Sequence, residues 1–219
     1  MIETIAVYAL PVVLAITLHE AAHGYVARHC GDLTAYKLGR VSLNPLRHVD
    51  WMGTIIVPLA ILIASRFAGA SGILFGWAKP VPVNFYALRR PKRDMLWVAA
   101  AGPASNIAQA IVWGALLKLA HLAAFGWADT LAAVATAGIM VNVTLTVLNL
   151  IPVLPLDGGR IMFSLLPDRL SYRYARIEPY GLIVLVIILV ADTQNRLLGP
   201  VTHQVSRLVA KLFHIDFEA

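Results

Sequence analysis

Cysteine and charge are scarce in this sequence. Cys30 is the only cysteine among 219 residues, which excludes an intramolecular disulfide and a cysteine-rich zinc finger. Charged residues make up 14% of the chain and apolar residues 59%, and the mean hydropathy is +0.73. A typical soluble domain has more charge and less apolar content, so this composition favours a membrane protein. The length fits a single domain, which we expect to comprise residues 1–219.

Internal repeats, low-complexity tracts and linkers are also absent, so we expect no regulatory domain beside the main one. The formal net charge is +6, but the sequence contains no basic helix or aromatic-interleaved basic patch, and we expect no nucleic-acid partner. A cleaved signal peptide is not expected either, because the first apolar run carries Glu3 near its start and both His and Glu in its interior.

Three apolar runs are long enough to cross a bilayer. A helix needs roughly 20 residues to span a hydrocarbon core of ~30 Å. Residues 4–27, 95–122 and 130–151 meet this length. The apolar segments 51–64 and 181–191 are shorter and fit a re-entrant segment, a tilted helix or a short span. We therefore predict an all-α polytopic membrane protein with a bundle of about four to six transmembrane or re-entrant helices.

Two further segments have patterns of their own. Prolines and glycines interrupt residues 66–94, so this stretch should be irregular, with a short extended or β segment near 81–85. Residues 196–213 place apolar side chains at helical spacing beside Arg207 and Lys211. This pattern predicts an interfacial helix in contact with the lipid bilayer.

Basic residues predict the orientation of the chain. The loops 28–50, 66–94 and 152–178 are rich in Lys and Arg, whereas loop 123–129 is not. Because cytoplasmic loops near the ends of spans are enriched in Lys and Arg, we expect the three basic loops on the cytoplasmic side of a multi-pass protein, in the cell membrane if the source is prokaryotic. This orientation requires that residues 51–64 re-enter the membrane rather than cross it once.

A metal-binding pattern lies inside the first apolar run. His19, Glu20 and His23 form the spacing His-Glu-x-x-His. Residues four apart lie on one face of a helix, so the two imidazoles can bind one zinc ion while Glu20 lies near the water to be activated. Such polar residues are unfavourable within a membrane unless they are paired or hold a metal. The alternative interpretation is a hydrogen-bonded triad in the core without a metal.

A catalytic zinc site usually has three protein ligands, and Asp157 is the best candidate for the third. It lies in the stretch Asn149 to Arg160, where two prolines and two glycines break the helix, so its carboxylate could turn back toward the membrane. In the expected orientation the runs 4–27 and 130–151 both finish on the inner side, so the ligands can meet there. An ordinary turn residue at a helix end is the alternative.

Taken together, the motifs resemble those of the site-2 protease family, the intramembrane zinc metalloproteases. Further motifs follow in the family's order at Gly39 to Pro45, Gly53 to Thr54, Gly76 to Asn84 and Ala101 to Asn106. The resemblance implies that His19, His23 and Asp157 bind one Zn²⁺. It implies that Glu20 activates water and that Asn149 polarises the substrate carbonyl or stabilises the oxyanion. The implied substrate is a transmembrane helix of another protein, and the chain looks like a compact member without a PDZ or CBS domain.

A substrate helix must unwind before hydrolysis, because its amides are hidden in internal hydrogen bonds. Residues 81–84 could hold the unwound segment by strand addition, since the prolines there leave an unpaired edge. Val83 and Asn84 are therefore candidate substrate-binding residues. Asn106, close to Gly102, is interpreted as a helix-packing residue.

Other functions fit parts of the sequence. A rhomboid-type serine protease could use Ser71, with His121 as the only histidine in an apolar setting. A non-catalytic metal transporter or sensor could use the same His and Asp residues, although transport favours ionisable residues spread along a path and these collect at one depth. The intact Glu20 argues against an inactive scaffold. The sequence predicts no oligomeric state.

Overall fold

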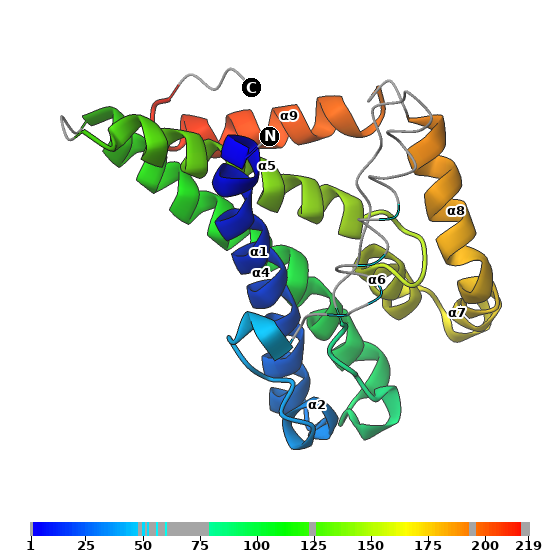
Figure 1. Ribbon diagram of the computed structural model, residues 1–219. Helices are drawn as coiled ribbons and strands as arrows, with labels where there is room; N and C mark the ends of the chain where they lie inside the picture. The colour runs from blue at the N-terminus through cyan, green and yellow to red at the C-terminus, as the bar shows by residue number, and fades with distance from the viewer. Residues whose placement is uncertain are drawn as a thin grey trace.

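The computed structural model describes residues 2–47, 50, 52, 56, 60, 79–122, 126–192 and 196–215. Within these residues the protein is helical and contains no strand (Figure 1). The α-helices are α1 (Ile2–His29), α2 (Thr34–Lys37), α4 (Pro91–Leu122), α5 (Ala128–Asn149), α6 (Asp157–Leu165), α7 (Asp168–Ala175), α8 (Glu178–Ala191) and α9 (Leu198–Lys211). Two short 3₁₀-helices, η1 (Pro45–Arg47) and η3 (Phe85–Ala87), complete the described structure.

The predicted long spans are confirmed as helices. Among the described residues, three helical stretches are long and apolar enough to cross a membrane, namely Ala6–His29 of α1, all of α4 and all of α5. Helices α7 and α8 meet at a bend of 69° and would supply a fourth span if the pair counts as one. The chain is therefore an all-helical, multi-pass membrane protein by the length and composition of its helices.

Helices α1, α4 and α5 pack against one another, and α9 lies across α5 at the end of the bundle where the chain begins (Figure 1). The main apolar core joins Trp113 of α4, Ile139 and Val143 of α5, and Val209 of α9. Gly138 makes this packing possible, because a Cβ atom there would lie 2.6 Å from Cε2 of Trp113. This apolar core therefore holds α4 against α5.

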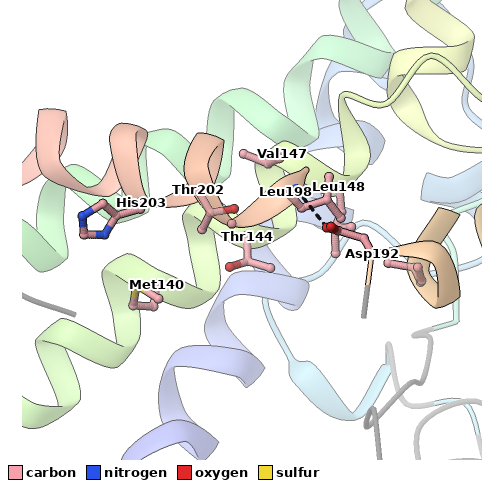
Figure 2. Close-up of a pocket in the computed structure, with 10 residues that line it drawn as sticks. Met140, Thr144, Val147, Leu148, Asp192, Leu198, Thr202 and His203 are labelled. Carbon is pink, nitrogen blue, oxygen red and sulfur yellow. Dashed lines mark hydrogen bonds between the residues drawn. The ribbon is translucent and has the colours of Figure 1, made fainter. Parts of the chain in front are cut away.

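The predicted interfacial segment corresponds to α9, which begins at Leu198. Asp192 accepts hydrogen bonds from the backbone N–H groups of Leu197 and Leu198, at 2.8 and 2.9 Å, and so caps the first turn of α9 (Figure 2). A cavity of about 380 Å³ lies beside this cap, between α5, α8 and α9, with Thr144 and Thr202 among its lining residues. None of the residues predicted to carry the chemistry lines this cavity.

The segment expected to be extended or a β-strand near 81–85 contains no strand among the described residues: 81–84 have no regular secondary structure, Asn84 has extended dihedrals (φ −93°, ψ 104°), and η3 begins at Phe85. Pro80 and Pro82 have no N–H group to donate to a ladder, which removes the regular pairing of a sheet. Side-chain carboxylates bind this segment instead: Asp32 accepts from the N–H of Asn84 at 2.6 Å. The Asn84 side chain then caps η3 by accepting from the N–H of Tyr86 at 3.1 Å.

This contact also places two of the basic loops at one end of the molecule. The N–H of Arg89 donates to the carbonyl of Cys30 at 3.0 Å, so the chain before α4 lies against the chain after α1. Figure 1 shows α2 and the start of α4 together at the end opposite α9. The predicted re-entrant segment 51–64, apart from Met52, Ile56 and Ala60, lies outside the described residues, as does Ser71.

Candidate metal centre

The three predicted ligands meet in the structure. His19 and His23 lie one turn apart on α1, and Asp157 is the first residue of α6. All three side chains are buried. One nitrogen from each imidazole and one carboxylate oxygen lie within 4.8 Å of one another, so the group could hold a metal ion. Asp157 and His23 are 134 positions apart in the sequence, and their contact brings the start of α6 against the second half of α1.

Hydrogen bonds fix which nitrogen of each imidazole faces the centre. Nδ1 of His23 lies 2.6 Å from the carbonyl oxygen of Val98, and Nδ1 of His19 lies 2.5 Å from Oδ1 of Asn106. Both partners are acceptors, so each Nδ1 carries the hydrogen. In a neutral imidazole Nε2 is then an acceptor with a free lone pair. Both free lone pairs belong to the nitrogens nearest Asp157.

The centre consequently gathers three acceptors. The two Nε2 atoms lie 3.1 Å apart, and they lie 3.2 Å (His19) and 3.3 Å (His23) from the carboxylate oxygens of Asp157. Oδ2 of Asp157 is buried and makes no hydrogen bond within the described structure. Acceptors this close repel one another unless a cation lies among them. Two imidazoles and one carboxylate form a donor set that suits a catalytic metal site with an open fourth position.

Gly102 lets α4 approach this centre. A Cβ atom at this position would lie 2.5 Å from Cε1 and 2.6 Å from Nε2 of His19, and it would also collide with Nε2 of His23. The sequence assigned Gly102 to close packing between helices. In the structure its close partners are the imidazoles of His19 and His23.

The turn between α5 and α6 positions Asp157. After Asn149 the chain turns through a segment with two prolines, and α6 then begins directly at Asp157. Gly158 and Gly159 pack onto that turn, because Cβ atoms there would lie 2.6 Å from the carbonyl oxygen of Ile151 and 2.5 Å from the carbonyl carbon of Val153. The glycine pair therefore lets α6 start against the turn, and its N-terminal dipole favours the carboxylate there.

Glu20 lines the same cavity as the three ligands. This cavity has a volume of about 140 Å³, and Val81, Val83, Asn149 and Arg160 also line it. Oε2 of Glu20 accepts a hydrogen bond from the N–H of Val81 at 2.7 Å. The Asn149 amide donates one of its N–H groups to the carbonyl of Leu145 at 3.0 Å, which leaves a second N–H group available.

The remaining predicted residues divide into two groups. Val83 lines the cavity, and its backbone makes no hydrogen bond within the described part of the chain. Asn84 is not among the lining residues and anchors the end of the segment through Asp32. Sequence reasoning missed the contact between Asn106 and His19. The sequence signal that could have indicated this contact is the polar side chain of Asn106 within the apolar run 95–122.

Comparisons with known proteins identify the family. A family model described as "Peptidase family M50" matches residues 116–191, which include Asn149 and Asp157. The Bacillus subtilis (strain 168) protein "Putative zinc metalloprotease YwhC" is 36% identical over 216 residues, which cover 95% of this chain and 91% of that protein. The chain belongs to peptidase family M50. The resemblance to site-2 proteases is thereby confirmed, and an enzyme is favoured over a transporter or sensor.

More distant relatives of this M50 chain carry the name "Putative zinc metalloprotease Rip2". The protein from Mycolicibacterium smegmatis (strain ATCC 700084 / mc(2)155) is 28% identical over 187 residues, covering 84% of this chain and 66% of that protein. The protein from Mycobacterium tuberculosis (strain ATCC 25618 / H37Rv) is 27% identical over 186 residues, covering 83% and 66%. No solved structure matches this M50 chain.

Proposed function

We propose that this M50 protein is an intramembrane zinc metalloendopeptidase that hydrolyses peptide bonds in or near transmembrane helices of other membrane proteins. The observation that carries the proposal is the convergence of His19, His23 and Asp157 beside Glu20, with both histidines on a helix able to span a membrane. A relative that shares 36% of its residues over nearly the whole chain is named as a zinc metalloprotease, and this supports zinc as the metal.

His19, His23 and Asp157 would hold one zinc ion per chain. When bound there, zinc supplies Lewis-acid polarisation of the scissile carbonyl and lowers the pKa of water. Glu20 directly follows His19 on α1 and lines the same cavity as the three proposed ligands. Its carboxylate is therefore placed to take a proton from the attacking water. The same carboxylate then delivers a proton to the leaving amine, which completes the hydrolysis without a covalent intermediate.

Asn149 would stabilise the negative charge that develops on the substrate oxygen. Its amide lines the cavity at the end of α5, and its second N–H group is available to an oxygen there. One such donor contributes roughly 3 kcal/mol to transition-state stabilisation in other hydrolases.

Val83 would bind the unwound substrate by pairing with its backbone, and Asn84 would hold Val83 in place. Support comes from the backbone N–H of Val83, which makes no hydrogen bond within the described residues, and from the place of Val83 in the cavity wall. A photoreactive amino acid at position 83 should therefore crosslink to a transmembrane substrate in lipid vesicles. The same probe at the exposed residue Tyr86, three positions further, should not. Equal crosslinking at both positions would contradict the role of Val83.

The active site would open toward the cytoplasmic side. The loops 28–50 and 79–94 are basic and contact each other at the end of the bundle where the ligands of α1 lie. Single cysteines at Lys37 and Arg90, in a Cys30→Ala background, should therefore react with a membrane-impermeant reagent only when it reaches the cytoplasmic face. Labelling of these two positions from opposite faces would contradict this orientation.

Removal of the metal tests the proposed chemistry directly. The purified protein, reconstituted with a model transmembrane substrate, should contain about one zinc ion per chain, because a catalytic site has one ion held by three protein ligands. A chelator should abolish cleavage, and an equimolar amount of zinc should restore it. Cleavage that persists in metal-free protein, or is lost only in Ser71→Ala, would contradict the metalloprotease mechanism and favour the serine mechanism.

A further inference from the structure

A chain of buried amides connects α5 to the metal centre through α4. Asn142 and Asn106 are both fully buried, with no exposed surface. Nδ2 of Asn142 donates to the carbonyl oxygen of Gly138 at 2.9 Å, and Nδ2 of Asn106 donates to Oδ1 of Asn142 at 3.1 Å. Oδ1 of Asn106 then lies 2.5 Å from Nδ1 of His19. Three consecutive contacts thus link one helix backbone to a proposed metal ligand.

The orientation of each amide in this hydrogen-bonded series is set by the carbonyl of Gly138, at the end away from His19. The carbonyl oxygen of Gly138 can only accept, so the amide of Asn142 must turn its NH₂ group toward it. Oδ1 of Asn142 therefore faces Asn106 and requires the NH₂ group of Asn106. What Asn106 then presents to His19 is its carbonyl oxygen, which requires a hydrogen on Nδ1. The lone pair of His19 is left on Nε2, the nitrogen that faces Asp157.

We propose that Asn142 is a positioning residue for the metal site, because it sets the tautomer of His19 without touching the ligand. The inference rests on the proposed zinc-dependent function. If the amide of Asn106 turned over, its NH₂ group would face Nδ1, and the hydrogen of a neutral His19 would move to Nε2, where it blocks metal binding.

His23 shows why His19 needs such a chain. Its Nδ1 faces the backbone carbonyl of Val98, which fixes the tautomer without any side chain. His19 faces a side-chain amide, whose oxygen and nitrogen can exchange places by a turn about one bond. Asn142 removes that freedom for His19. A backbone carbonyl therefore orients His23, whereas side-chain amides orient His19, and only the side-chain amides can be changed by substitution.

A double-mutant experiment separates this role from a packing role. Asn142→Leu keeps the size of the side chain but lets the Asn106 amide turn over. Asn106→Leu removes the amide whose orientation is in question, so Asn142→Leu should cause no further loss of zinc affinity in that background. Thr146→Val is the matched control, because Thr146 is buried one turn further along α5 and only donates to the backbone carbonyl of Asn142. Zinc affinity of the full-length protein in lipid vesicles is measured by competition with a chromogenic chelator.

We expect Asn142→Leu to weaken zinc binding by about tenfold, as partners of metal ligands commonly do. Thr146→Val should bind zinc like the parent, and Asn142→Leu combined with Asn106→Leu should bind it as tightly as Asn106→Leu alone. Parental affinity in Asn142→Leu, or an equal loss in both backgrounds, would overturn the inference. Asn142→Ser, which is smaller and retains a hydroxyl, repeats the comparison if the leucine variant does not fold. A parent that binds no zinc would overturn the proposed function as well.

Discussion

Glu20→Gln should lower peptide-bond cleavage by about 10²–10⁴-fold while the bound zinc stays at the parental level. The substitution keeps the size of the side chain and removes the group that accepts the proton from water. Zinc should be retained because Glu20 is not among the three residues whose ligand atoms converge. Cleavage of a reconstituted transmembrane substrate and metal content, measured on the same preparation, check both parts.

Glu178→Gln is the matched control for this change. It makes the same chemical substitution at the exposed first residue of α8, outside the cavity, and should leave cleavage at the parental rate. Full activity of Glu20→Gln would remove Glu20 from the mechanism. Loss of zinc together with activity would instead make Glu20 a metal ligand.

Gly102→Ala should abolish zinc binding and, with it, cleavage. The added methyl group would lie 2.6 Å from Nε2 of His19 and would collide with Nε2 of His23, so it would occupy the space where the three ligands converge. Helix α4 cannot retreat easily, because it packs against both α1 and α5 and contributes Trp113 to the main apolar core. We therefore expect the zinc content, measured by mass spectrometry on purified protein, to fall from about one ion per chain to almost none.

Gly126→Ala supplies the comparison. Gly126 lies before α5, and a Cβ atom there would meet nothing within 4 Å. The variant should keep zinc, cleavage and thermal stability. If Gly102→Ala bound zinc as tightly as Gly126→Ala, the close approach of α4 to the imidazoles would not be a requirement of the site.

The spans and the convergence of the three proposed ligands were predictable, because their signals are local or depend on few constraints. Length and apolar content define α1, α4 and α5, and the four-residue spacing places His19 and His23 on one helical face. The third ligand followed from one break in the chain. Prolines and glycines around Asp157 stop a helix, and a charge at that point needs partners.

The amide chain was beyond sequence reasoning, because it depends on how three helices are rotated against one another. Asn106 was interpreted as a packing residue, and Asn142 was not singled out at all. Each asparagine alone is compatible with an ordinary contact between helices. Only the observed distances of 2.5 and 3.1 Å show that the two amides are joined and end on a metal ligand.

The expected β segment failed for a related reason. Its prolines were used to predict a free edge, but the same prolines remove the donors that a regular strand requires. Carboxylates of Glu20 and Asp32 bind two of the other N–H groups, those of Val81 and Asn84. These contacts come from residues 61 and 52 positions away in the chain, and local patterns give no sign of them.

The hydrogen bond between Val81 and Glu20 has a consequence for catalysis. The cavity beside Glu20, at about 140 Å³, is close in size to one that encloses a benzene molecule, which is too small for an extended polypeptide. Between Pro80 and Pro82, Val81 supplies the single backbone donor, and that donor holds the carboxylate the reaction needs. In the described conformation the chain's own backbone thus binds the carboxylate proposed to accept the proton. We therefore expect an incoming peptide to displace residues 80–82, and breaking one charge-assisted hydrogen bond costs about 1.5–3 kcal/mol.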